Sequence, residues 1–263
     1  MDTTDVSTIL AAVIRAEREA AELIMHAHGV LAEAKTGHRD VVTEYDKRVQ
    51  ALLMERLSAA VPGARFFCEE NNVHGDLGAE HVFVIDPIDG TMNFVRRMHH
   101  SCISVAYMSC GVPEAAAVYD PYAHELFTAV RGAGAFLNSR PIRAESEPLS
   151  ETVFCLGTSP YRTDLTDETF RLARLAYDAT LDLRRFASAE LDLCSVAAGR
   201  AGLYFELSLS LWDYAAGSLI VTEAGGVCTD LAGAPLPFDG RKSSIAAGGV
   251  QAHADFMALI KEE

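Results

Sequence analysis

The sequence is poor in positive charge, in paired cysteines and in long apolar runs. It has 22 Lys and Arg residues against 37 Asp and Glu residues, and its formal net charge is −15. Charge of this sign repels nucleic acid and anionic lipid, and no apolar run approaches the roughly 20 residues of a membrane span. The first residues also lack the basic start and apolar core of a signal peptide. We therefore expect a cytoplasmic protein that binds neither nucleic acid nor membrane.

The cysteines form no pattern that is typical of disulfides or zinc sites. None of the six belongs to a CxxC pair, and most lie within apolar runs. We expect small buried thiols in a reducing compartment. With 263 residues, of which 49% are hydrophobic, the chain can bury a sizeable core without such cross-links.

The spacing of apolar residues predicts helices in the first part of the chain, followed by strands. Apolar positions recur at helical spacing over residues 6–34 and again over Asp46–Ala60. Short apolar segments bounded by Gly, Pro or Asp then predict strands. These strands are expected over Arg65–Cys68, Val82–Ile85, Cys102–Met108, Ala115–Tyr119 and Glu125–Val130.

The second half of the chain alternates predicted strands and helices. Strands are expected over Leu183–Phe186, Leu203–Glu206 and Ser244–Ala247. Helices are expected over Thr166–Asp178, Leu191–Arg200, Asp213–Ala224 and Ala252–Lys261. We therefore predict a single unit made of an α+β half, residues 1–145, and an α/β half, residues 146–263, joined near the polar segment Ala144–Ser150.

The strongest motif is Asp86–Thr91, with the sequence DPIDGT, directly after an apolar strand. Proline fixes its own φ and biases Asp86 toward an extended conformation. Asp86 and Asp89 can then both project from the end of the strand. The Ile88 carbonyl lies between them and can serve as a further oxygen ligand.

Gly90 and Thr91 complete this motif. Glycine allows a ligand to approach the backbone closely. A helix that starts at Thr91 would direct its free N–H groups to the same point, which suits a phosphate. The alternative is an ordinary turn in which Asp caps a helix, but that explains one of the two aspartates and leaves the other unexplained.

Further acidic residues are candidates for the same site. Glu69 and Glu70 end a predicted strand 17 residues before Asp86, although paired Glu side chains are usually only solvated. Asp213 and Asp46 each stand where a helix is predicted to begin, and ordinary capping explains either of them alone.

Together these residues resemble the two signatures of the inositol monophosphatase family, which belongs to a magnesium-dependent, lithium-sensitive phosphomonoesterase superfamily. The first signature is Asp86–Thr91, and the second is Trp212–Gly217 with Glu223–Gly226. The resemblance covers about residues 35–248. Its other matching segments are Asp40–Asp46, Glu69–Glu70, Arg131–Phe136 and Ala197–Arg200. It implies a layered αβαβα sandwich like that of inositol monophosphatases and fructose-1,6-bisphosphatases, and usually a homodimer.

The resemblance also implies roles for individual residues. The implied metal ligands are Glu69, Asp86, Asp89, Asp213 and the carbonyl of Ile88. Asp46 and Thr91 are implied to orient and deprotonate the attacking water, with Glu70 helping at the metals. The amides of Gly90 and Thr91 are implied to receive the phosphate.

The chemistry of these candidate ligands independently favours magnesium. All of them are hard oxygen donors, which prefer Mg²⁺ or Mn²⁺ to Zn²⁺. Four carboxylates at one point repel each other unless cations lie between them. Two or three Mg²⁺ ions would offset that repulsion, attract a phosphate dianion and support direct in-line attack by water.

The expected substrate is a small phosphate monoester, myo-inositol 1-phosphate or a related polyol or sugar monophosphate. The resemblance assigns Glu206 and Asp213 to substrate contacts, although a surface Glu at a strand end explains Glu206 equally well. Ser188 and Ala189 match a segment that contacts the sugar ring. Lys35 is expected at the start of a loop that covers the site or binds a water between the metals.

Several residues depart from the family pattern, and three of them bear on the site. Cys68 and Ala187 replace glycine, and Glu190 replaces a small residue. Ala187 and Glu190 flank the substrate segment, so they affect the prediction of the substrate more than that of the phosphatase chemistry. Two alternatives stay open: a broader sugar-bisphosphate or phosphonucleotide phosphatase, and a regulatory protein that keeps the fold without turnover.

Overall fold

The computed structural model describes residues 5–37 and 40–261. The first four residues, on which the expectation of no signal peptide partly rests, lie outside the described part. Within the described residues, no helix combines the length and the apolar character needed to cross a bilayer.

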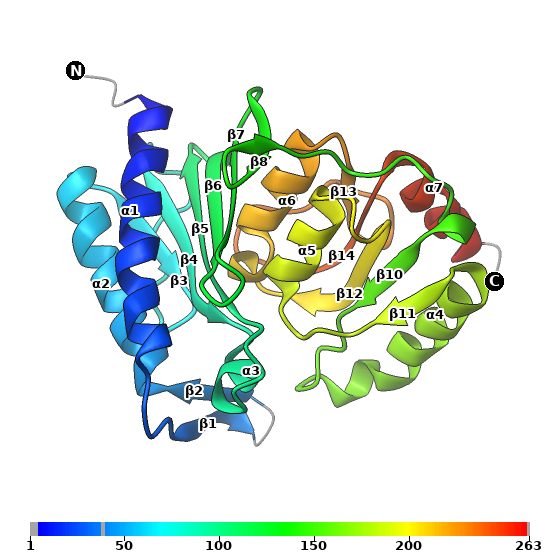
Figure 1. Ribbon diagram of the computed structural model, residues 1–263, viewed down its shortest axis with the longest axis horizontal. Coiled ribbons are helices and arrows are strands. Elements are labelled where there is room, and N and C mark those ends of the chain that lie inside the picture. The colour runs from blue at the N-terminus through cyan, green and yellow to red at the C-terminus, as the bar shows by residue number, and fades with distance from the viewer. Residues whose placement is uncertain (1–4, 38–39, 262–263) are drawn as a thin grey trace.

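Two large β-sheets and three layers of helices alternate through the molecule (Figure 1). The first sheet has seven strands in the order β3-β4-β5-β6-β7-β8-β9. All of its neighbouring strands are antiparallel except β3 and β4. Its strands are β3 (Arg65–Cys68), β4 (Val82–Asp89), β5 (Cys102–Ser109), β6 (Val112–Asp120), β7 (Glu125–Val130), β8 (Gly134–Leu137) and β9 (Arg140–Pro141).

Helices α1 (Val6–Met25) and α2 (Glu44–Ala60) cover the outer face of this sheet. Residues of the strands alternate between faces, so Phe83 and Ile85 pack toward α1 and α2 while Val82 and Val84 pack toward the inner layer. Both faces of β4 are therefore buried, which explains its continuous apolar run before Asp86.

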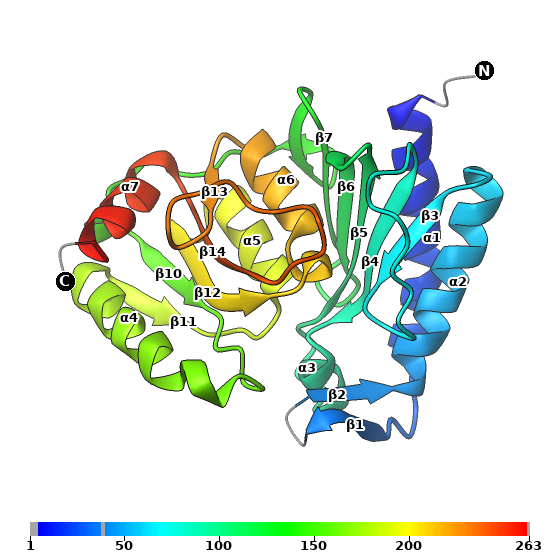
Figure 2. The same ribbon diagram turned by 180° about the vertical axis from the view of Figure 1, so that it is seen from behind.

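The second sheet has five strands in the order β11-β10-β12-β14-β13. Its strands are β10 (Val153–Leu156), β11 (Asp182–Arg184), β12 (Leu203–Leu209), β13 (Val227–Thr229) and β14 (Ser243–Gly248). Helices α5 (Ala189–Ala197) and α6 (Ala215–Glu223) lie between the two sheets, and α4 (Thr166–Ala179) and α7 (Val250–Leu259) cover the far face (Figure 2). The expected αβαβα sandwich is confirmed.

Several short elements complete the fold. Strands β1 (Ala32–Gly37) and β2 (Asp40–Thr43) form a separate antiparallel pair next to the five-residue helix α3 (Thr91–Val95). Three 3₁₀ turns are η1 (Leu149–Glu151), η2 (Thr163–Leu165) and η3 (Leu211–Asp213). The segment from Ile142 to Pro148 joins the two sheets, and the division at residues 145 and 146 stays a prediction.

The helix expected over residues 6–34 is wrong in its last part. Helix α1 ends at Met25, and residues from Ala32 onward form β1. Gly29 has φ +62°, a left-handed conformation that a helix continuing to residue 34 could not contain. Alanine and glutamate in β1 favour helix intrinsically, so pairing with β2 overrides local propensity here.

Other elements differ from expectation mainly at their ends. The helix expected over Asp213–Ala224 begins only at Ala215, because Asp213 closes the preceding 3₁₀ turn. The helix expected over Leu191–Arg200 runs over Ala189–Ala197, and the strand expected over Leu183–Phe186 runs over Asp182–Arg184. Six strands were not predicted: β1, β2, β8, β9, β10 and β13.

Candidate functional site

Asp86 and Asp89 point to the same face of β4 because this strand contains a β-bulge between them. Asp86 pairs with Ser104 of β5, and Asp89 pairs with Cys102. The chain therefore advances by three residues along β4 where it advances by only two along β5. In a regular strand, residues three apart point to opposite faces, whereas one extra residue restores the same face. Pro87, which has no N–H to donate, lies within this irregular segment. The DPIDGT spacing therefore directs both carboxylates to the inner side of the sheet.

Asp89 connects the first sheet to the inner helix α5. Its Oδ2 accepts hydrogen bonds from Ser188 Oγ at 2.6 Å and from the Glu190 amide at 2.8 Å, and its Oδ1 accepts one from the Ala189 amide at 3.3 Å. Ser188 is the N-cap residue of α5, so these donors belong to the first turn of that helix. A carboxylate is the group that free helix N-terminal amides favour.

Asp213 and Glu69 reach the same place from other elements. Asp213 ends η3, which packs against β4, and its Oδ2 accepts from the Ser210 amide at 2.6 Å. Glu69 directly follows β3, the neighbour of β4. Burial raises the pKa of Asp86 well above its usual value, and the charges of Glu69, Asp89 and Asp213 raise it further. Four carboxylates from three parts of the chain therefore lie within electrostatic reach of one another.

Burial also disfavours ionisation at two other members of this cluster. It raises the pKa of Glu69 to about 7, although the ammonium of Lys35 opposes the shift. It raises the pKa of Asp89 to about 6, although the hydrogen bonds from Ser188, Glu190 and Ala189 oppose that shift. Such a concentration of buried carboxylates is stable as anions only beside a compensating cation. The oxygen-only donor set fits Mg²⁺ or Mn²⁺.

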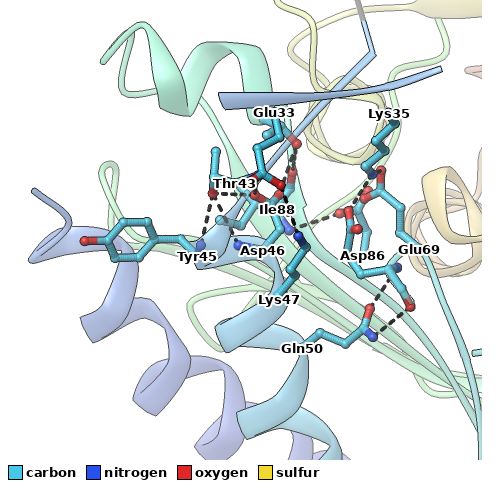
Figure 3. Close-up of polar contacts among 12 residues, drawn as sticks. Glu33, Lys35, Thr43, Tyr45, Asp46, Lys47, Gln50, Glu69, Asp86 and Ile88 are labelled. Atoms are coloured by element: carbon cyan, nitrogen blue, oxygen red, sulfur yellow. Dashed lines mark hydrogen bonds and ion pairs between the residues drawn. The ribbon is translucent and has the colours of Figure 1, made fainter. Parts of the chain in front are cut away.

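Lys35 supplies one compensating charge in the structure. Its Nζ lies 2.7 Å from Glu69 Oε1 and 2.5 Å from Glu70 Oε1, so the ammonium joins β1 to the end of β3 (Figure 3). Burial lowers the pKa of Lys35, but the two glutamates more than offset this and the net shift is upward. Among the described residues, no three His, Cys, Asp or Glu side chains stand close enough together to enclose a metal ion as they are placed.

Glu70 is held through its backbone. Gln50 of α2 is buried, donates to the Glu70 carbonyl at 3.0 Å and accepts from the Glu70 amide at 2.9 Å (Figure 3). This reciprocal pair fixes the chain directly after β3. Gln50 was not predicted as a site residue, since a lone glutamine in a helix carries no sequence signal of such a role.

Asp46, Thr91 and Ile88 form a chain of hydrogen bonds beside the carboxylates. Asp46 Oδ2 closes a capping box with Thr43 at the start of α2, which fulfils the capping role considered from the sequence. Its other oxygen, Oδ1, accepts from Thr91 Oγ1 at 3.2 Å, and the Ile88 carbonyl lies 3.0 Å from the same hydroxyl oxygen. Asp46 is fully buried. Because one carboxylate does both tasks, capping and a contact with Thr91 are not exclusive.

Gly90 must be glycine for two reasons. Its φ is +87°, a left-handed conformation that other residues rarely adopt. A Cβ there would also lie 3.1 Å from both the Ala187 and the His100 carbonyl oxygens. Gly90 is the N-cap residue of α3, which begins at Thr91 as anticipated.

These residues border one open pocket of about 580 Å³. A volume of this size suits a small-molecule ligand. The predicted residues that line it are Glu69, Asp89, Gly90, Thr91, Ser188, Ala189, Glu206 and Asp213. The pocket lining does not include Asp46, Glu70, Asp86 or Ile88.

Glu206 lines the pocket but is already bonded within the protein. Its Oε1 accepts from the Ser159 amide at 2.7 Å and from the Ser159 hydroxyl at 2.8 Å, and its Oε2 accepts from Tyr204 at 2.8 Å. A carboxylate has about four acceptor positions, so one position is left for a substrate hydroxyl. Glu206 is also buried, which argues against the plain surface residue considered from the sequence.

Comparison with known proteins decides the family. The model of the inositol monophosphatase family matches residues 5–263. This chain belongs to the inositol monophosphatase family. The putative Nus factor SuhB of Neisseria meningitidis serogroup B is 37% identical over 223 residues, which cover 83% of this chain and 85% of that protein. The family therefore includes relatives with regulatory names.

Solved structures of the family share the whole fold. The inositol monophosphatase of Anabaena (Nostoc) sp. PCC 7120 is 30% identical, covers 98% of this chain and 97% of its own, and superposes with a TM-score of 0.86. An IMPase/NADP phosphatase complexed with Mg²⁺ and phosphate is 24% identical, with a TM-score of 0.84 over 98% of this chain and 95% of its own. At that identity the second similarity establishes the fold only.

The departures from the family pattern have distinct structural roles. Burial raises the pKa of the Cys68 thiol to about 12, so this side chain is inert. Ala187 lines the pocket and adopts φ +67°, the conformation that glycine favours. Glu190 does not belong to the pocket lining. Its Oε2 accepts from the Gly217 amide at 2.6 Å and ties α5 to α6, so Glu190 acts on packing rather than on substrate contact.

Three pocket residues with acidic or basic side chains were not predicted from the sequence. Asp192 of α5 is buried, and its Oδ1 has no hydrogen-bond partner among the described residues. Arg96 and Arg185 are exposed and border the pocket. An acid between two leucines in a helical segment was the one available signal for Asp192.

Proposed function

We propose that this protein is a Mg²⁺-dependent phosphomonoesterase that hydrolyses myo-inositol 1-phosphate or a related polyol or sugar monophosphate. The observation that carries the proposal is the convergence of Glu69, Asp86, Asp89 and Asp213 beside the Asp46–Thr91 hydrogen bond at one pocket. Membership of the inositol monophosphatase family supports the reaction class.

In this proposal the carboxylates of Glu69, Asp86, Asp89 and Asp213 and the Ile88 carbonyl hold two or three Mg²⁺ ions, with Mn²⁺ as a substitute. When bound, the metal lowers the pKa of a coordinated water and neutralises charge on the leaving oxygen. These cations would also offset the like-charge repulsion that, after burial, raises the pKa of Asp86. We expect lithium to inhibit the reaction and the protein to form a homodimer, as the family resemblance implies.

The residues next to the ligands orient and deprotonate water. Thr91 Oγ1 lies 3.2 Å from Asp46 Oδ1, so the threonine hydroxyl can donate to that carboxylate and accept from a water. Glu70 lies beside this group and shares Lys35 with Glu69. The proton of the attacking water then has an acceptor path that needs no covalent nucleophile.

The other pocket residues are proposed to hold the ester. The Gly90 and Thr91 amides receive the phosphate, while Ser188, Ala189 and Asp213 lie beside the ring that bears it. Glu206 offers its last acceptor position to a ring hydroxyl. In Glu206→Gln, we expect a lower preference for inositol 1-phosphate over glycerol phosphate, measured as a ratio of kcat/KM values. An unchanged ratio would remove Glu206 from substrate selection.

Phosphate release from inositol 1-phosphate tests the proposal directly. We expect release with Mg²⁺, none with EDTA, and a loss of at least about 100-fold in Asp89→Asn, because a metal ligand is lost. Asp178→Asn, which makes the same change at an exposed ion pair on α4, is the control and should retain activity. Absence of release from polyol, sugar and nucleotide monophosphates would reject the enzyme.

A regulatory role is the second candidate because the related protein of Neisseria meningitidis is named a putative Nus factor. Such a role would depend on the surface of the folded protein rather than on catalytic turnover. The partners of the protein would then include nucleic-acid complexes. Asp89→Asn separates the two: a partner-binding phenotype that survives the loss of phosphate release would support regulation.

A further inference from the structure

The pocket has a cationic end as well as an acidic one. Arg96 and Arg185 are the only basic side chains among its lining residues in the described part of the chain. Its acidic lining residues are Glu69, Asp89, Asp192, Glu206 and Asp213. Two arginines at one pocket stand out in a chain whose net charge is −15.

A hydrogen-bonded link holds the two arginines' segments together. Asn93 of α3 donates to the Phe186 carbonyl at 2.6 Å and to the Ala187 carbonyl at 3.4 Å. Arg96 follows Asn93 by three positions, as the C-cap residue of this short helix, and Arg185 directly precedes Phe186. The link therefore places both guanidinium-bearing segments at one rim of the pocket.

Arg96 and Arg185 each have an arginine as a sequence neighbour, Arg97 and Arg184, and the two members of each pair differ in their surroundings. Arg184 forms an ion pair with Asp182 at 2.5 Å, and Arg97 does not line the pocket. Arg185 instead donates to Thr158 Oγ1 at 2.9 Å, and its charge lowers the pKa values of Asp192 and Glu206, which burial raises. The Arg96 guanidinium has no hydrogen-bond or ion-pair partner among the described residues. One member of each pair is thus directed to the pocket.

We propose that Arg96 and Arg185 form a subsite for a second anionic group of the substrate, so that phosphorylated sugars or polyols with two phosphates are preferred. The planar guanidinium donates two parallel hydrogen bonds to phosphate oxygens. Glu206 and Asp192 line the same pocket, where they can accept from ring hydroxyls. The inference rests on the proposed phosphatase function and adds a substrate class to it.

Matched substrate pairs test the subsite. Inositol 1,4-bisphosphate is compared with inositol 1-phosphate, and fructose 1,6-bisphosphate with fructose 1-phosphate, each with Mg²⁺. We expect kcat/KM to be about 10-fold higher for the bisphosphate of each pair, because charge-assisted hydrogen bonds give gains of this order. Preference within one pair alone would identify which ring the subsite accepts. Equal values within both pairs would overturn the proposal.

Substitution of single arginines separates an effect of the subsite from a general effect of positive charge on substrate binding. Arg96→Gln and Arg185→Gln should each reduce the bisphosphate preference about 5-fold or more through KM, with the monophosphate within about 2-fold of wild type. Arg97→Gln and Arg184→Gln remove the same charge outside the pocket and should leave the preference intact. Equal losses in these controls, or parallel losses for both esters in the pocket variants, would overturn the proposal.

The subsite can be tested separately from the proposed phosphatase activity by measuring substrate binding. If no ester releases phosphate, calorimetric titration with the bisphosphate and the monophosphate still measures the subsite. Tighter binding of the bisphosphate that is lost in Arg96→Gln would support the subsite and reject turnover. Equal binding of the two esters would reject the subsite as well.

Discussion

The Asp89 carboxylate accepts a 2.6 Å hydrogen bond from the Ser188 hydroxyl, a residue 99 positions away. Asp89 ends a strand of the seven-stranded sheet, and Ser188 begins the helix that packs toward the five-stranded sheet. The geometry of the proposed metal ligand therefore depends on how these two parts of the fold are joined.

Ser188→Ala tests whether this bond orients Asp89. We expect the variant to fold and to require about 10- to 100-fold more Mg²⁺ for half-maximal activity, the usual effect of losing a hydrogen bond to a metal ligand. Ser195→Ala, in the same helix, removes a hydroxyl bonded to the Leu191 carbonyl and is the matched control. If both variants shift equally, the effect comes from the helix and not from Asp89.

Thr91→Val tests the Asp46–Thr91 pair. The substitution keeps the shape of the side chain and removes the hydroxyl that bridges Asp46 and Ile88. We expect kcat to fall by about 10²- to 10⁴-fold with little change in KM, as for the loss of a general base, and Thr91→Ser to recover most of it. A Val variant with normal kcat would exclude this hydroxyl from water activation.

The carboxylate cluster makes the stability of the metal-free protein depend on pH. The pKa of Glu69 is raised from 4.5 to about 7 and that of Asp89 from 3.8 to about 6, chiefly by burial. Between about pH 4 and pH 7 the folded state therefore binds more protons than the unfolded state, so stability falls as pH rises. We expect the Tm in EDTA to be lower at about pH 8 than at about pH 5, and Mg²⁺ to reverse the difference.

Glu69→Gln is the control for this pH dependence. It removes one of the titrating groups, so the decline of Tm in EDTA should become shallower. If the decline is identical in wild type and variant, other groups cause it.

Lys35→Met tests the ammonium between Glu69 and Glu70. Removing it leaves two largely buried glutamates without their common cation. We expect the metal-free variant to lose at least about 1 kcal/mol of stability, measured by urea unfolding, and to gain more from Mg²⁺ than the wild type does. Lys47→Met breaks an exposed pair with Glu33 and should cost less than about 1 kcal/mol. Equal effects of the two substitutions would deny Lys35 a special role.

An element of the fold could be predicted where its residue pattern is compatible with only one type of secondary structure. The strands Arg65–Cys68 and Glu125–Val130 have the expected bounds, because each is an apolar segment between turn residues. Strand β1 was not predictable, since its alanine and glutamate residues favour helix and only pairing with β2 makes it a strand. Strand β10 is an interior strand of the second sheet, and its short apolar sequence has no alternation to reveal it.

The sequence predicted the site residues of the DPIDGT motif, but it did not predict the residues at the rim of the pocket. Asp86 and Asp89 carry a sequence signal because Pro87 and Gly90 constrain their backbone, and the bulge in β4 makes use of that constraint. Gln50 and the two rim arginines carry none, because their positions follow from contacts between distant segments.

Diffraction from crystals soaked in Mn²⁺ shows whether the four carboxylates bind a shared set of metal ions. We expect anomalous peaks within about 2.0–2.2 Å of oxygens from Asp86 and Asp89, with at least one of these ions also bound by Glu69 or Asp213. Saturating Mn²⁺ that gives no peak at this cluster, or peaks bound by Asp86 and Asp89 with Glu69 and Asp213 both out of reach, would contradict shared binding.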